Sequence, residues 1–198
     1  MSDALKIKII IGSTRKNRFG DKPARWIAGL LEKKAGVETE ILDLRDYPMP
    51  FFDESETPNY KSAPYAEPHV AAWTKKIAEA DGFVVIAAEY NHGYTAVLKN
   101  ALDYVAQEWR DKAVGFVGYG SALGSRAIEQ LRGVVVELQM APIRYAVHMP
   151  FDVVMAGNKG TPESELFSAY DDRGEGMLDQ LIAWSKALKA LRTPANAA

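Results

Sequence analysis

Five short runs of apolar residues are spaced along the chain, each followed by a segment of different pattern. Leu5–Ile11 reads LKIKIII and stops at Gly12, which is typical of a buried strand. Gly82–Ala88 (GFVVIAA) is the most apolar run and is expected at the centre of a sheet. The strands predicted in this way span residues 5–11, 37–44, 82–88, 113–117 and 143–149.

Apolar residues recur at helical spacing between most of these runs. In residues 23–34 the apolar positions are Ala24, Ile27, Ala28, Leu30 and Leu31, and Gly36 ends the pattern. The remaining predicted helices span residues 69–80, 95–107, 124–139 and 174–191. Strands that alternate with helices indicate a mostly parallel sheet covered on both faces, joined by right-handed crossovers. No repeat or linker interrupts residues 1–192, so one domain is expected, with a disordered tail at 193–198.

Residues 45–68 differ from the rest. They hold five of the ten prolines together with a run of aromatic residues. A loop of this length inside a domain is more often functional or disordered than idle, and aromatic residues argue against disorder. The segment either covers a site or contacts a partner.

Composition narrows the possible functions. Of 198 residues, 47% are hydrophobic and 25% charged, and the net charge of -2 favours neither a nucleic-acid nor a membrane-surface partner. The absence of cysteine excludes disulfides and thiolate sites and fits the cytoplasm. Neither a signal peptide nor a bilayer-spanning run is found. The three histidines show no metal-ligand spacing, so no metal is expected.

The loop after the first strand, residues 12–20, suits a phosphate. It leads into a helix, whose first turn offers unpaired amides and the positive end of the dipole. Ser13 and Thr14 add hydroxyls, and Arg15, Lys16 and Arg18 add charge. The dinucleotide and Walker glycine patterns are absent, so a terminal monophosphate is the expected ligand. The alternative is a solvated loop in which Ser13 or Thr14 caps the helix.

Two further loops should meet the first at one edge of the sheet, because ligands bind where the order 2-1-3-4-5 reverses. Residues 88–95 can pair their backbone with a heterocycle while Tyr90 or Tyr94 stacks on it. Residues 118–126 carry glycines that permit a close approach to a flat ligand. The alternatives are a core role for Tyr90, a turn-forming role for Asn91 and a flexible turn after residue 118.

These three loops resemble those of the NADPH-dependent FMN reductase family. The most specific part is Glu89-Tyr90-Asn91 followed at a fixed spacing by the LKNALD segment of residues 98–103; the GSTR segment of residues 12–15 matches the family's phosphate loop. The similarity runs from about residue 6 to about residue 147. Two departures stand out: Ala88 replaces a usual proline, and Ala96 replaces a usual glycine.

The resemblance implies a flavodoxin-like three-layer α/β sandwich with a five-stranded parallel sheet. It also implies FMN as cofactor, NADPH or NADH as co-substrate, and ping-pong transfer of electrons to a small oxidant such as a quinone, flavin, azo compound or chromate. A homodimer or homotetramer is the implied assembly. The implied FMN-binding residues are Ser13, Arg15, Arg18, Phe19, Gly20, Ala88, Glu89, Tyr90, Asn91, Gly118, Gly120 and Ser121.

Three points stay open from the sequence. A flavodoxin-type electron carrier is the competing function, although carriers are usually strongly acidic and this chain is not. No protein acid or base is required for hydride transfer, so no catalytic residue is assigned. His92 lies near the expected ring and either donates a proton to the oxidant or faces water.

Overall fold

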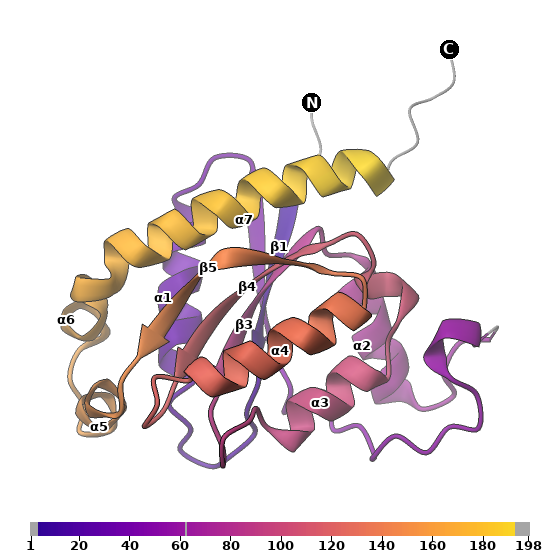
Figure 1. The fold of residues 1–198 in the computed structure, drawn as a ribbon, viewed down its shortest axis with the longest axis horizontal. Coiled ribbons are helices and arrows are strands. Elements are labelled where there is room, and N and C mark those ends of the chain that lie inside the picture. The colour runs from indigo at the N-terminus through magenta and orange to yellow at the C-terminus, as the bar shows by residue number, and fades with distance from the viewer. Residues whose placement is uncertain (1–3, 62, 193–198) are drawn as a thin grey trace.

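The computed structural model describes residues 4–61 and 63–192, so the expected tail at 193–198 lies outside the described residues. Five parallel strands form one sheet in the order β2-β1-β3-β4-β5, as predicted (Figure 1). The strand bounds are β1 Leu5–Ile11, β2 Val37–Asp43, β3 Gly82–Ala88, β4 Ala113–Tyr119 and β5 Ala141–Met149.

Helices cover both faces of the sheet. Their bounds are α1 Asp21–Glu32, α2 Pro68–Ala78, α3 Ala96–Asp103, α4 Ser125–Glu137, α5 Phe151–Asn158, α6 Glu163–Phe167 and α7 Asp171–Arg192. Short 3-10 turns lie at Pro58–Tyr60, Gln107–Trp109 and Ser168–Tyr170. Within the described residues, none of the helices combines the length and apolarity that a bilayer crossing requires.

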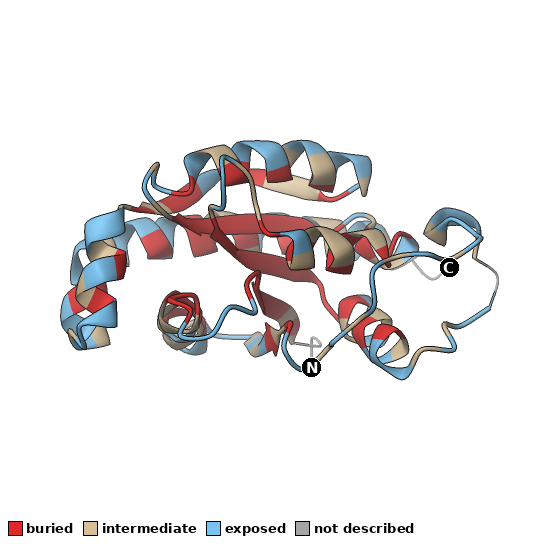
Figure 2. Ribbon diagram, turned by 90° about the horizontal axis from the view of Figure 1, so that it is seen from below, coloured by how far each residue is buried: buried red, intermediate tan, exposed pale blue. Residues whose placement is uncertain are grey.

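Strand periodicity divides the core into two layers. Ile7 and Ile9 of β1 pack with α1 and α7 on one face, whereas Ile10 packs with α2, α3 and α4 on the other. Figure 2 shows the sheet as a buried layer between these helices. β3 is buried at all seven positions, which confirms its predicted central place.

The structure corrects the prediction in two places. The sequence pattern predicts no element between residues 150 and 173, yet α5 and α6 form there and α7 starts at Asp171. α5 is only eight residues long and α6 five, too short for a helical period to stand out. The predicted helix 95–107 ends at Asp103, after which the chain turns into a 3-10 segment.

Candidate functional site

The loops after β1, β3 and β4 meet at the carboxyl edge of the sheet, where the strand order reverses. They enclose a recess of about 120 Å³. Seven of the predicted site residues line it, together with Tyr119 from the third predicted loop and with Phe151 and Val154, which the sequence does not indicate. The seven are Arg15, Arg18, Phe19, Ala88, Glu89, Tyr90 and Gly120.

Two arginines hold the first loop by its carbonyl oxygens. Arg18 Nη1 donates to the carbonyl of Ser13 at 2.6 Å. Arg45, just beyond β2, donates from Nη2 to the carbonyl of Arg15 at 2.5 Å and from Nε to that of Thr14 at 3.4 Å. Three successive carbonyls are therefore engaged by guanidinium groups.

Three amides of the same loop have no partner in the part of the chain that the structure describes. They are the amides of Thr14, Lys16 and Asn17. The first turn of α1 is partly satisfied, because the Lys22 amide donates to the Phe19 carbonyl at 3.0 Å, whereas the Asp21 amide has no acceptor among the described residues. Free amides beside a helix N-terminus form an anion-binding arrangement. The donor set therefore fits a phosphate group such as that of FMN.

Arg18 differs from the sequence-based expectation. Its side chain is 2% exposed and pairs with Asp43 through both terminal nitrogens and with Asp21 through Nε at 2.7 Å. Burial alone would raise the pKa of Asp43, but the hydrogen bonds from Arg18 and from the Arg45 amide lower it. The Arg18 charge is thus compensated inside the protein, and the residue positions the loop. Arg15 is the loop arginine with an exposed side chain that also borders the recess.

Phe19 and Gly20 face inward. Phe19 is buried and meets Tyr119 edge to face, with ring centroids 5.2 Å apart. A Cβ atom on Gly20 would lie 3.1 Å from the Tyr119 hydroxyl oxygen. Phe19 also packs against Phe167, so the region after β5 supports the floor of the recess.

The second loop contains a tight turn at residues 90–93. Tyr90 and Gly93 exchange two backbone hydrogen bonds, of 2.8 and 3.1 Å. Asn91 and His92 between them have φ of 48° and 76°, the combination of a type I′ turn. The turn-forming interpretation of Asn91 is confirmed. The core interpretation of Tyr90 is wrong, because the residue is 38% exposed.

Two contacts tie this turn to the other loops. The Tyr90 hydroxyl lies 2.9 Å from Ser13 Oγ, which joins the first loop to the second. Glu89 has a side chain only 3% exposed and accepts from Arg126 Nε at 2.6 Å and from the Arg126 amide at 3.3 Å. Ala88, at the end of β3, is buried and keeps the preceding backbone inside the sheet.

Glycines bring the third loop close to the second. Gly120 has φ of 147°, and a Cβ there would lie 3.1 Å from Glu89 Cβ. Gly124 has φ of 68°, and its Cβ would lie 2.3 Å from the Tyr119 amide nitrogen, so no larger residue fits. Gly118 is buried in β4, and Ser121 is exposed beside it. The loop is folded closely on β4, which does not support the flexible-turn alternative.

Several functional residues escaped sequence reasoning. Asp43 and Arg45 stand at the end of β2, at the same edge of the sheet as the site, and both contact the first loop. Their Asp-x-Arg spacing could have indicated this only once the fold was known. Thr95 donates to the Gly12 carbonyl and caps α3, as a threonine before a helical run suggests. Phe151 and Val154 come from α5, and the pattern there gives no comparable signal.

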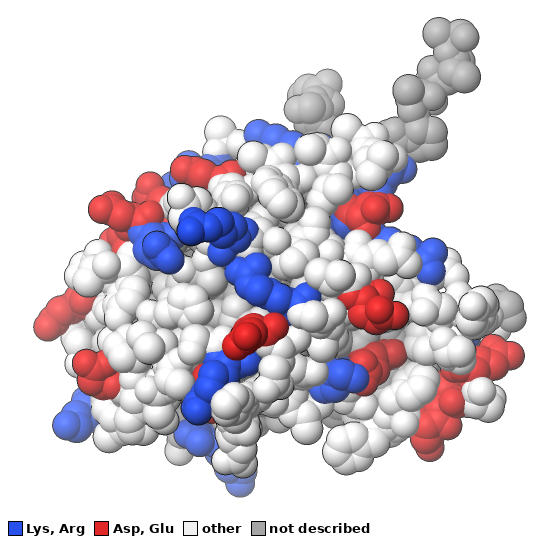
Figure 3. Space-filling model, in the orientation of Figure 1, with Lys and Arg blue, Asp and Glu red and all other residues white. Residues whose placement is uncertain are grey.

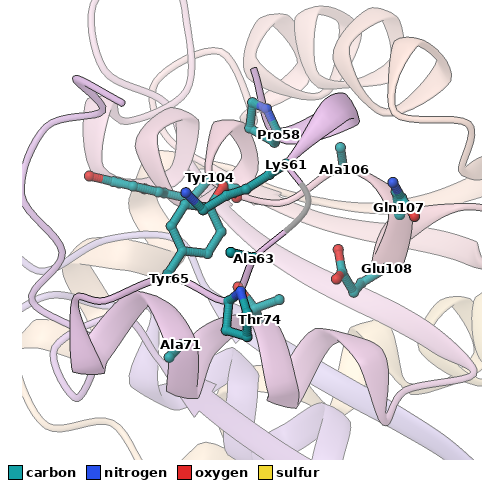
Figure 4. A pocket seen from close by; sticks show the side chains of 11 residues that line it. Pro58, Lys61, Ala63, Tyr65, Ala71, Thr74, Tyr104, Ala106, Gln107 and Glu108 are labelled. Atoms are coloured by element: carbon teal, nitrogen blue, oxygen red, sulfur yellow. The ribbon is translucent and has the colours of Figure 1, made fainter. Parts of the chain in front are cut away.

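The proline-rich segment packs against α2 and α3. Asn100, from the Leu-Lys-Asn segment, donates to the Pro50 carbonyl at 2.7 Å and accepts from the Phe52 amide at 2.9 Å. A second, larger hollow of about 360 Å³ lies there. Figure 4 shows the side chains that line it, with Lys61 close to the ring of Tyr65. This hollow shares no lining residue with the recess at the sheet edge.

Comparison with known proteins decides the family. The model of the family described as NADPH-dependent FMN reductase matches residues 5–153. The chain belongs to this family. It is 36% identical over 154 residues to an NAD(P)H-dependent FMN reductase of Schizosaccharomyces pombe, covering 77% of each chain. It is 28% identical over 194 residues to a 2-hydroxy-1,4-benzoquinone reductase of a Burkholderia species, covering 91% of this chain and 96% of the relative.

Solved structures agree on the fold. The flavoenzyme NAD(P)H:acceptor oxidoreductase FerB of Paracoccus denitrificans superposes with a TM-score of 0.69 at 18% identity, covering 93% of this chain and 98% of FerB. Family membership confirms the expected class of NAD(P)H oxidoreductase that uses FMN. The electron-carrier alternative finds no support in these relatives.

Proposed function

We propose that this FMN reductase family member reduces a small planar acceptor, a quinone above all, at the edge where β1, β3 and β4 end. The observation that carries the proposal is the first loop, whose free amides sit beside the N-terminus of α1 while arginines occupy its carbonyls. The name of the Burkholderia relative supports a quinone as the acceptor.

Different residues would bind the phosphate and the ring of FMN. The free amides of residues 14, 16 and 17 and the Ser13 hydroxyl would hold the phosphate of FMN, and Arg15 would add an exposed positive charge. Glu89 to Asn91 and Gly118 to Ser121 would form the two walls that hold the flavin ring. FMN supplies the redox chemistry when bound, and the protein supplies position and a fixed electrostatic environment.

Most charged side chains at the site are compensated by a partner of opposite charge. Glu89, Arg18 and Asp43 are all paired within the protein. Figure 3 shows a group of basic side chains near the centre of one face of the molecule, with acidic side chains around it. A neutral, flat acceptor such as a quinone suits a site of this kind, and NADPH and NADH remain equal candidates as its reductant.

Assembly and location complete the proposal. We expect a homodimer or homotetramer, and the exposed aromatic side chains of Phe51 and Tyr60 offer apolar contact area for it. Light scattering coupled to size exclusion would measure the mass of the assembly. The cysteine-free sequence fits the cytoplasm as its compartment.

A spectroscopic titration tests the function. Purified protein is loaded with FMN, made anaerobic and mixed with NADPH, then with a benzoquinone. The flavin absorption is expected to bleach with NADPH and to return when quinone is added, with parallel lines in double-reciprocal plots. A protein that leaves the absorption and fluorescence of added FMN unchanged would contradict the proposal.

A further inference from the structure

His92 is held in a fixed place at the mouth of the site. Its backbone has φ of 76° inside the closed turn between Tyr90 and Gly93. Gln130 of α4 donates from Nε2 to the His92 carbonyl at 2.8 Å. An exposed histidine on an ordinary loop would have neither restraint. The side chain therefore leaves a rigid backbone between the second loop and the start of α4.

Arg126 contacts one nitrogen of the His92 ring. Its Nε and Nη2 are occupied by the buried carboxylate of Glu89, which fixes the orientation of the guanidinium plane. The remaining nitrogen, Nη1, lies 3.5 Å from His92 Nδ1. Arginine has donors and no acceptor, so this contact requires an unprotonated Nδ1 with its lone pair toward Arg126. A neutral imidazole in that position carries its hydrogen on Nε2.

Arg126 and Gln130 are four residues apart on α4 and thus share one face of the helix. Arg126 contacts the ring of His92, and Gln130 contacts its backbone. The same helix face therefore contacts both the backbone of the turn and the imidazole ring. Glu89 contributes to this arrangement from within the predicted flavin-binding loop, so the restraint on His92 is continuous with the site.

We propose that Glu89 and Arg126 hold His92 in the Nε2–H tautomer, with Nε2–H as a hydrogen-bond donor to a carbonyl oxygen of the acceptor. This inference rests on the proposed function and makes His92 a substrate-orienting residue, with Arg126 as its positioning residue. Reduction of a quinone to a hydroquinone takes two electrons and two protons. The electrons and one hydrogen derive from NAD(P)H by way of the cofactor, and the second proton comes from water. His92 polarises the carbonyl and keeps its own hydrogen, as a neutral imidazole can.

Nitrogen-15 NMR tests the tautomer without any turnover. The chain has three histidines, so the ring signals of His92 can be assigned by substitution. The wild type is expected to show Nε2 protonated and Nδ1 unprotonated, and the Arg126→Gln variant to show a mixture of tautomers. His69→Gln, on α2, is the control and should leave the His92 signals in place. A protonated Nδ1 or an unchanged pattern in Arg126→Gln would overturn the inference.

Two substitutions of His92 test the role in the reaction. The amide nitrogen of glutamine reaches the position of Nε2, whereas that of asparagine reaches the position of Nδ1. The readout is the ratio of kcat/KM for a benzoquinone to that for ferricyanide, which takes electrons without a proton and has no carbonyl. We expect this ratio to fall about 10-fold in His92→Asn and less than about 3-fold in His92→Gln.

The outcomes separate this inference from the proposed function. Asparagine tolerates positive φ, so a loss in His92→Asn does not reflect a strained turn. Equal losses in both variants, or no loss in either, would overturn the donor role. A wild type that fails to oxidise NADPH in the presence of FMN would instead defeat the proposed function, and the NMR result would still decide the tautomer.

Discussion

The first loop and the turn at residues 90–93 are both held by arginines, yet opposite parts of the chain are engaged. In the first loop Arg18 and Arg45 bind backbone carbonyls, and the amides of residues 14, 16 and 17 have no acceptor among the described residues. In the turn, Tyr90 and Gly93 satisfy each other, and Arg126 binds the Glu89 side chain instead. The comparison shows that arginines can serve two purposes. In the first loop they hold a backbone that offers amides to an anion, and at the turn Arg126 holds side chains in place.

Removing the carboxylate behind the first loop should have the largest effect. Asp43→Ala leaves the buried Arg18 with Asp21 alone, and we expect the free energy of unfolding to fall by about 3 kcal/mol. Urea unfolding measures the loss. The matched control is Glu163→Ala, which removes the pair with the half-exposed Arg25 and should cost less than about 1 kcal/mol. Equal losses in the two variants would show that Arg18 does not depend on Asp43.

Releasing two carbonyls of the first loop should affect binding more than folding. Arg45→Ala frees the carbonyls of Thr14 and Arg15, so the loop amides lose their fixed direction. We expect about 10-fold weaker FMN binding in a fluorescence titration, with a small change in stability because Arg45 is exposed. Unchanged affinity would mean that the amides keep their orientation without the guanidinium.

Removing the hydrogen bond between the first and second loops should have a smaller effect on FMN binding. Tyr90→Phe deletes the hydroxyl that meets Ser13 Oγ and keeps the ring. One hydrogen bond of about 1 kcal/mol corresponds to roughly 5-fold in the dissociation constant of FMN. Tyr94→Phe, in the segment that follows the turn, serves as a control. A loss greater than 50-fold in Tyr90→Phe would indicate that the hydroxyl itself contacts the cofactor.

The smallest expected effect is the pH dependence of the stability that Asp43 contributes. The pKa of Asp43 lies below its ordinary value of 3.8, so its contribution is complete above that pH and is lost as the pH falls through the lowered pKa. The difference in unfolding free energy between wild type and Asp43→Asn should therefore be constant from pH 7 to about 5. It should shrink as the pH approaches about 2, and a difference that persists there would contradict the pairing with Arg18.

Much of this arrangement follows from the pattern of the chain. The five strands, their order and the three loops at one edge were all predictable, because apolar runs and right-handed crossovers allow few topologies. The role of Arg18 was not, since its partner Asp43 lies 25 residues away at the end of β2 and charge alone cannot show which carboxylate it meets. Phe151 was missed for a related reason, because the eight-residue α5 has no visible period and its place beside Phe19 depends on tertiary packing.

The most direct test of the account compares the dissociation constants of FMN and riboflavin, measured by quenching of flavin fluorescence. The two ligands share the ring and differ in the phosphate that the first loop is proposed to hold. Two charge-assisted hydrogen bonds from the free amides predict that FMN binds about 100-fold more tightly, and that this preference falls in Arg45→Ala. Equal affinity for the two flavins would contradict the assignment of the first loop as the phosphate site.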